Sequence, residues 1–160
     1  MLLKTTSGRP VFIVITGLPG AGKSTLLAGL RVLHGEKAVA PVVHSSDALR
    51  QELYGDAAVQ GDNAALFAEL YRRIRADLQH GKDVVLDATS LTQKVRANAL
   101  RQVSGCDCTP VAVFLNTDVE TCLKRNQMRD RHVPEEVIRR MASYMTPPTE
   151  SEGFVDVIIY

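Results

Sequence analysis

The sequence predicts an α/β fold, a three-layer α/β/α sandwich in which helices cover both faces of a parallel sheet of about five strands, with an added helical lid. Two observations carry this prediction. Short apolar, β-branched runs alternate with longer segments of helical periodicity along the whole chain, which is typical of parallel sheets. The first apolar run, 11–16, leads directly into a glycine-rich loop and a helical segment.

The length and composition are typical of one ordinary globular domain. The chain has 160 residues, and we expect a single domain over 1–160. The formal net charge is +1, from 19 basic and 18 acidic residues, which argues against a protein that coats a nucleic-acid duplex with a large basic face. No apolar run is long enough to span a membrane, and residues 1–7 lack the apolar core of a secretory signal, so cytoplasm is the default expectation.

The first part of the chain predicts two strands and one helix. The β-branched run 11–16 is expected to be a buried strand. Leucines at helical spacing predict a helix over 23–34, with Gly35 as its C-cap. The apolar run 39–44, which Pro41 interrupts, is the second expected strand.

Two helices and a third strand follow. A helix is expected over 47–54, and a longer one over 62–80 with Gly81 closing it. The longer helix has an apolar stripe at helical spacing, which consists of Phe67, Leu70, Ile74 and Leu78. Residues 83–87 form the third expected strand.

The last part of the chain repeats the alternation. The segments 90–93 and 117–120 have capping-box spacing, so each is expected to open a helix, and the strand 111–115 lies between these helices. Pro134 followed by two glutamates indicates the first turn of the last helix. The run 155–159 is the fifth expected strand.

The loop after the first strand is the strongest functional signal. It reads Gly17-Leu18-Pro19-Gly20-Ala21-Gly22-Lys23-Ser24, with Thr25 behind it, and fits the pattern G-x-x-x-x-G-K-[ST]. In this pattern backbone N–H groups cradle phosphates, Lys23 reaches the β- and γ-phosphates, and the Ser24 hydroxyl coordinates Mg²⁺. A glycine turn that only packs a helix onto a strand would explain neither side chain. The sequence therefore predicts binding of ATP, or another nucleoside triphosphate, with magnesium.

An acidic and a basic residue follow the second expected strand. Asp47 and Arg50 are three residues apart, so on a helix they share one face. One interpretation is functional: the carboxylate accepts a proton from an acceptor hydroxyl, and the guanidinium holds an acceptor phosphate. The other interpretation is an ion pair near a helix start, and the spacing alone does not separate the two.

Asp87 ends the third expected strand, where it is placed to hold Mg²⁺ through water or to orient Arg50. The alternative is an acid that caps the following turn. A basic cluster near the end of the next-to-last helix predicts a lid whose arginines neutralise charge on the triphosphate. It consists of Lys124, Arg125, Arg129 and Arg131.

Several stretches together resemble the 5′-hydroxyl polynucleotide kinase family, in particular its bacterial kinase domains. Besides the phosphate-binding loop, they are Ser45-Ser46-Asp47-Ala48-Leu49-Arg50, Val85-Leu86-Asp87-Ala88-Thr89-Ser90, Lys124-Arg125-Asn126 with Arg129, and the tail Pro147–Phe154 with its Glu-Gly-Phe ending. The resemblance covers nearly the whole chain. It implies a kinase that transfers the γ-phosphate of ATP to a polynucleotide 5′ end.

The resemblance also implies roles for single residues. Asp47 would be the general base for the acceptor hydroxyl, Arg50 would bind the neighbouring acceptor phosphate, and Asp87 would support the site. Arg125 and Arg129 would contact the donor phosphates, with Arg129 acting in catalysis beside Lys23. Asp62 is a weak candidate for a further acid on the acceptor side.

Two other functions stay open. A kinase on the same fold with a metabolite, an antibiotic or an aminoacyl group as acceptor agrees with the near-neutral charge and with an aromatic content of 5% without tryptophan. A nucleotide switch without catalysis is the third reading, but it gives Asp47 and Arg50 no role.

Overall fold

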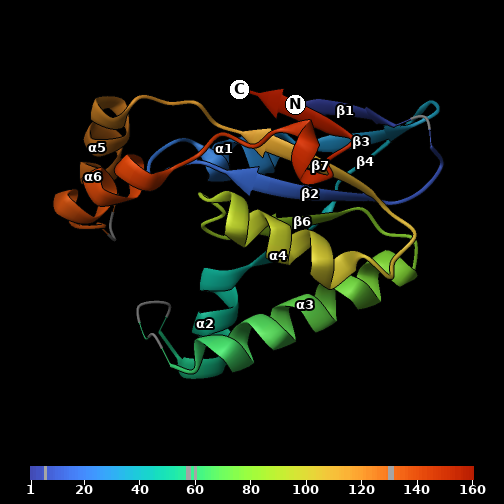
Figure 1. Ribbon diagram of the computed structural model, residues 1–160, viewed down its shortest axis with the longest axis horizontal. Coiled ribbons are helices and arrows are strands. Elements are labelled where there is room, and N and C mark those ends of the chain that lie inside the picture. Colours follow the sequence, from blue (N-terminus) through green and yellow to red (C-terminus); the bar gives the residue numbers. More distant parts are fainter. Residues whose placement is uncertain (6, 57–58, 60, 130–131) are drawn as a thin grey trace.

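The computed structural model describes residues 1–5, 7–56, 59, 61–129 and 132–160. It confirms the α/β fold, with a parallel central sheet between helical layers (Figure 1). Among the described residues five strands form this sheet, in the order β5-β6-β2-β7-β8. In that order they are Val42–Ser45, Val84–Asp87, Val11–Thr16, Thr109–Phe114 and Asp156–Ile159.

Each face of the central sheet has its own cover. The helices α2 (Ser46–Tyr54), α3 (Asn63–Gln79) and α4 (Gln93–Val103) lie on one side, and α1 (Lys23–Gly29) lies on the other (Figure 1). Two further helices, α5 (Val119–Gln127) and α6 (Glu135–Tyr144), lie beyond the carboxyl ends of the central strands and are called the lid below.

The central strand β2 shows why the sheet is buried on both sides. All six of its residues are buried. Ile13 and Ile15 belong to the core on the α1 side, whereas Phe12 and Val14 belong to the core under α3 and α4. Because side chains alternate across a strand, a continuous apolar run supplies both cores at once.

The helix predicted over 23–34 is shorter than expected. α1 ends at Gly29, and Leu30 is extended. Arg31–His34 is strand β3, which pairs with β1 (Leu2–Thr5) and, in a hairpin, with β4 (Lys37–Val39). Gly35, predicted as a helix C-cap, instead turns this hairpin with a φ of 61°. The predicted run 39–44 is accordingly divided between β4 of this small sheet and β5 of the central one.

The helix caps also differ from two predictions. Thr92 rather than Ser90 is the N-cap of α4, and Asp118 rather than Thr117 is the N-cap of α5. Ser90 is fully buried below the strand ends, so its side chain is not at the helix start. Asp62, the weak acceptor-side candidate, is the N-cap of α3 and accepts the Ala65 N–H at 3.0 Å.

Within the described part of the chain, none of the helices combines the length and apolar character needed to cross a bilayer. The parallel strands bring their carboxyl ends to one edge of the sheet. Thr16, Ser45 and Asp87 end three neighbouring strands there, and the phosphate-binding loop begins directly after Thr16. This edge is where ligands bind in open parallel sheets.

Candidate functional site

The phosphate-binding loop connects β2 to α1 and depends on two glycines. Gly20 and Gly22 have φ values of 84° and 104°, a region that residues with a Cβ disfavour. Gly20 also lies against the backbone of Cys122 in α5. A Cβ on Gly20 would collide with the Cys122 carbonyl oxygen and lie 3.0 Å from the carbonyl carbon. The loop and the lid therefore touch backbone to backbone.

No side chain caps the start of α1, whose N-cap is Gly22. The first N–H groups of a helix have no partner within the helix, and they bear a partial positive charge. Gly22, Lys23, Ser24 and Thr25 all line the same cleft. The start of α1 is thus an anion site of the kind that phosphate-binding loops present.

Lys23 is held across the loop. Its Nζ donates hydrogen bonds to the carbonyl oxygens of Gly17 and Leu18, both at 2.8 Å. Burial lowers the pKa of the Lys23 ammonium, and the carboxylate of Asp87 partly opposes that shift. An ammonium has three N–H donors, so one donor is left for a phosphate oxygen.

Asp87 ends β6 next to Ser45 at the end of β5. Burial raises the pKa of the Asp87 carboxyl group, the negative charge of Asp47 raises it further, and Lys23 together with a Ser45 hydrogen bond lowers it. The charges of Lys23, Asp87 and Asp47 therefore influence one another, and all three side chains line the same cleft.

Asp47 and Arg50 form the ion pair that their spacing predicts. Arg50 Nη1 donates to Asp47 Oδ1 at 3.2 Å, and Nη2 donates to Asn63 Oδ1 at 2.9 Å. The Arg50 side chain is 13% exposed and that of Asp47 is 66% exposed. The ion pair and the functional interpretation are compatible, because Asp47 lines the cleft while Arg50 lies behind it.

The lid brings two of the predicted arginines to the cleft. Arg125 in the last turn of α5 and Arg129 just beyond it both line the cleft. The start of α5 is fixed to the phosphate-binding loop, since the Thr117 hydroxyl donates to the Ala21 carbonyl oxygen at 3.0 Å. Arg131 lies outside the described residues.

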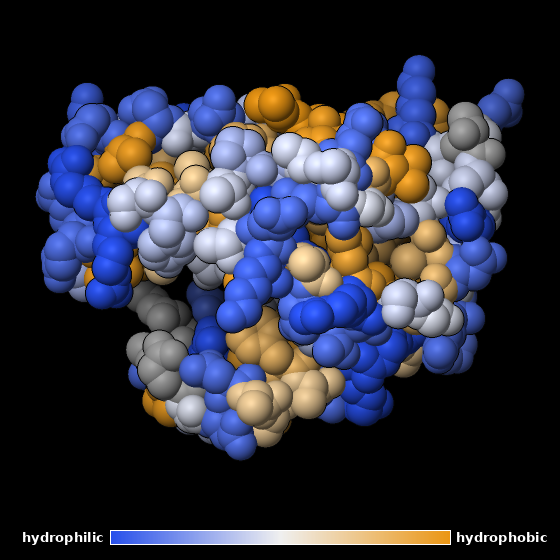
Figure 2. All heavy atoms as spheres, viewed as in Figure 1, coloured by the Kyte–Doolittle hydropathy of each residue, from blue (hydrophilic) through white to orange (hydrophobic). Residues whose placement is uncertain are grey.

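The cleft has a volume of about 730 Å³, and Figure 2 shows the molecule hollowed between the lid and α2. Of the predicted site residues, it is lined by Pro19, Gly20, Gly22, Lys23, Ser24, Thr25, Asp47, Asp87, Arg125 and Arg129. Gly17 and Ala21 are buried beneath it. The structure therefore gathers the predicted donor and acceptor residues around one space, with Arg50 directly behind.

Sequence reasoning gave no site role to Asn63 or to six of the residues that line the cleft, which are Ser45, Ser46, Ala88, Thr89, Val133 and Met141. Val133 and Met141 add apolar lining from the lid, and the apolar face of α6 could have indicated Met141. Asn63, which holds Arg50, lies in the first turn of α3, and no sequence pattern connects it to α2.

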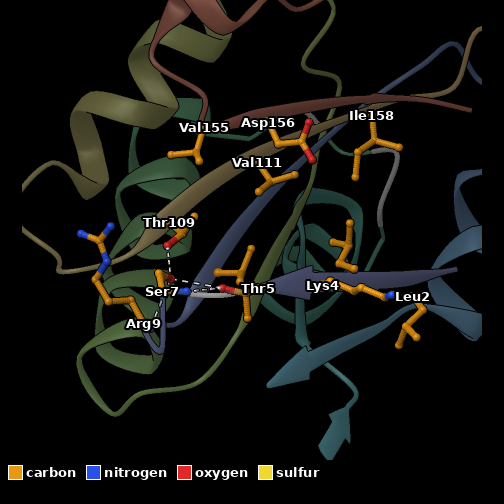
Figure 3. A pocket seen from close by; sticks show the side chains of 12 residues that line it. Leu2, Lys4, Thr5, Ser7, Arg9, Thr109, Val111, Val155, Asp156 and Ile158 are labelled. Carbon is orange, nitrogen blue, oxygen red and sulfur yellow. Dashed lines mark hydrogen bonds between the residues drawn. The ribbon is translucent and has the colours of Figure 1, made fainter. Parts of the chain in front are cut away.

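A second cavity, of about 510 Å³, lies between β1 and the strands β7 and β8 (Figure 3). Its polar lining includes Lys4, Ser7 and Asp156, and Ser7 and Thr109 are hydrogen-bonded at 2.8 Å. None of the predicted site residues lines this cavity, so the cleft beneath the lid is the candidate site.

Comparison with known proteins supports the fold and identifies the family of this chain. A curated relative, L-seryl-tRNA(Sec) kinase of Methanococcus maripaludis, is 26% identical over 147 residues, which are 88% of this chain and 54% of the relative. The chain thus spans about half the length of that relative.

Solved structures give the same fold. One in the Pnkp1/Rnl/Hen1 RNA repair complex has a TM-score of 0.74 at 16% identity, and the match covers 88% of this chain and 45% of that one. APS kinase CysC of Mycobacterium tuberculosis has a TM-score of 0.59 at 21% identity, with coverage of 94% and 88%. A gluconokinase from Sinorhizobium meliloti has a TM-score of 0.57 at 18% identity, with coverage of 94% and 81%.

The family assignment rests on the sequence itself. The model of the AAA domain family matches residues 12–148, which include the phosphate-binding loop, Asp47, Asp87 and both lid helices. The match begins within β2 and ends beyond α6. The chain belongs to the AAA domain family.

Proposed function

We propose that residues 1–160 form one P-loop kinase domain that transfers the γ-phosphate of ATP to the 5′-hydroxyl end of a polynucleotide, DNA or RNA. The observation that carries the proposal is that Asp47, which is ion-paired with Arg50, lines the same cleft as the phosphate-binding loop. A nucleotide-binding loop alone would serve any triphosphatase. An acid at the cleft surface, backed by an arginine, adds what an acceptor hydroxyl next to a phosphate requires.

The donor side would use the loop from Gly17 to Thr25, with Lys23 on the β- and γ-phosphates. Mg²⁺ prefers oxygen ligands and usually keeps waters and substrate phosphates around it. The Ser24 hydroxyl and, through water, the Asp87 carboxylate fit that preference, and both line the cleft. A bound Mg²⁺ would neutralise charge on the β- and γ-phosphates. Arg125 and Arg129 would add positive charge from the lid, Arg129 in the transition state.

On the acceptor side, Asp47 would accept the proton of the 5′-hydroxyl as its oxygen attacks the γ-phosphorus. The bond from the γ-phosphorus to the β–γ bridging oxygen breaks in the same transfer, and ADP leaves. Arg50, held by Asp47 and Asn63 in a fixed orientation, would bind the phosphate next to the 5′ end.

The similarities to known proteins support kinase activity, whereas the identity of the acceptor is our proposal. The relative from Methanococcus maripaludis is named as a kinase that acts on a seryl-tRNA, and one structural neighbour belongs to an RNA repair complex. The RNA repair complex agrees with a polynucleotide acceptor, whereas the name of the seryl-tRNA kinase agrees equally with an aminoacyl group as acceptor.

A small-molecule acceptor is the second candidate. Gluconokinase and APS kinase share the fold, the net charge is +1 and aromatic residues make up only 5% of the chain. Salt separates the candidates: a polynucleotide displaces counterions, so its KM rises steeply with ionic strength, whereas a neutral metabolite shows little change.

The test is transfer of labelled γ-phosphate from MgATP to 5′-hydroxyl DNA and RNA oligonucleotides in parallel. We expect transfer by the wild type, loss of ATP binding in Lys23→Ala, and intact ATP binding with lost transfer in Asp47→Ala. Wild-type transfer by Asp47→Ala would refute the assigned base. Absence of transfer with intact ATP binding in the wild type would favour the small-molecule acceptor.

A further inference from the structure

A charged pair outside the cleft is buried completely. Arg96 of α4 and Glu152, in the short 3₁₀ helix η1 (Glu150–Glu152), have side chains 0% and 2% exposed. The guanidinium donates Nε to Glu152 Oε2 at 2.8 Å and Nη2 to Oε1 at 2.7 Å. Glu152 belongs to the Glu-Gly-Phe tail, to which the proposed reaction assigns no role.

The remaining donors of Arg96 reach the backbone on both sides of it. Nη1 donates to the Thr146 carbonyl oxygen at 2.8 Å and to the Ser90 carbonyl oxygen at 3.1 Å, and Nη2 approaches the Pro147 carbonyl oxygen at 3.3 Å. All the donors of a guanidinium are thereby engaged. Thr146 is two residues beyond the end of the lid helix α6.

The same contacts continue to the phosphate-binding loop. The Ser90 carbonyl oxygen also accepts the Thr16 hydroxyl at 3.1 Å, and Thr16 directly precedes Gly17. Ser90 is three residues beyond Asp87. The Thr146 N–H donates to the Leu91 carbonyl oxygen at 2.9 Å, which holds the lid exit against this same segment.

We propose that Arg96 is a positioning residue that fixes the exit of the lid relative to Asp87 and the phosphate-binding loop. This inference rests on the proposed kinase function. Arg96 does not line the cleft, so it acts only through the segments that it joins. The other end of the lid is fixed separately, where Thr117 bonds Ala21. The lid is thus attached at both ends to the two segments that carry the donor site.

The charges of Arg96 and Glu152 are not needed for the stability of the fold. A buried ion pair gains little over well-packed apolar side chains, because both charges lose their hydration. What an apolar pair lacks is the planar fork that holds three carbonyl oxygens and a carboxylate in fixed directions. A lysine at 96 keeps the charge but removes the fork, and so it separates the two contributions.

The experiment compares Arg96→Lys and Glu152→Gln with the wild type, at a temperature where unfolding curves show each variant folded. Steady-state transfer gives kcat and the KM for ATP. We expect Arg96→Lys to lower kcat at least 10-fold and to change the KM for ATP less than 3-fold, with Glu152→Gln in between. The matched control is Arg139→Lys, a surface arginine on α6 paired with Glu120 and Glu135, which should leave kcat unchanged.

Tryptic cleavage in the lid, with and without MgATP, is the second readout. MgATP should protect the lid of the wild type and of Arg139→Lys, and should protect that of Arg96→Lys much less. Folded Arg96→Lys with wild-type kcat and wild-type protection would overturn the inference. If the wild type transfers no phosphate to any acceptor, the proposed function fails, while the protection experiment still decides the role of Arg96.

Discussion

Replacing Gly20 by alanine tests the contact between the phosphate-binding loop and the lid. The new Cβ meets two separate obstacles. The φ of 84° is left-handed, which costs about 1–2 kcal/mol for a residue with a Cβ. The Cβ also collides with the Cys122 carbonyl group, and forced overpacking of this kind costs about 1–3 kcal/mol more. Because the obstacle is backbone and not a flexible side chain, α5 or the loop must move.

Gly35→Ala is the matched control. Gly35 has a φ of 61° in the β3–β4 hairpin, but a Cβ there meets nothing within 4 Å. The control therefore carries the backbone cost alone, about 1–2 kcal/mol. We expect the free energy of unfolding, from urea titrations, to fall by roughly 1–3 kcal/mol more in Gly20→Ala than in Gly35→Ala. Equal losses in the two variants would show that α5 does not rest on the loop, and would refute the reasoning.

Three further predictions concern the cleft. Lys23→Met should abolish the rise in melting temperature that MgATP produces in the wild type, because the phosphates lose their side-chain cation; an undiminished rise would contradict the assignment. Arg50→Lys should raise the KM for a 5′-hydroxyl oligonucleotide about 10-fold or more, since a lysine cannot form two parallel bonds to a phosphate, and unchanged acceptor kinetics would exclude that contact. Burial raises the pKa of Asp87 in the fold, so the native protein binds the proton of this carboxyl group more tightly than the unfolded chain does. Stability therefore falls as the pH rises from the pKa of Asp87 in the unfolded chain to its raised pKa in the native protein. Asp87→Asn should therefore stabilise the ligand-free protein at pH 7 and lose this advantage in acid, as thermal melts at both pH values would show.

The sequence predicted those parts of the site whose signals are local. The phosphate-binding loop is a contiguous pattern, and Asp47 and Asp87 each follow an apolar strand whose carboxyl end faces the cleft in any parallel sheet. The strand alternation that indicates such a sheet also lies in short windows. These features need no knowledge of which distant segments pair.

The features that the sequence did not predict correctly depend on contacts between segments that are distant in the chain. The helical spacing of Leu26, Leu27 and Leu30 predicts a helix that continues through 31–34, but these residues pair with β1 instead, and that tertiary pairing outweighs local preference. The partner of Arg50 in α3 and the partner of Arg96 in the tail are likewise distant in sequence. Such contacts exist only once the chain has folded, so no local sequence pattern predicts them.

The place of β2 in the middle of the sheet has a consequence for the synthesis of the chain. Phe12 pairs with Val84 in β6, which is made about 72 residues later, and Val11 pairs with Thr109 in β7, about 98 residues later. The apolar strand β2 therefore stays unpaired until β6 has been made and keeps one open edge until β7 follows, and closing such long loops is slow. Through that interval β2 is exposed to aggregation and is a natural binding segment for chaperones. The phosphate-binding loop is therefore made well before the strands β6 and β7 that complete the sheet beneath it.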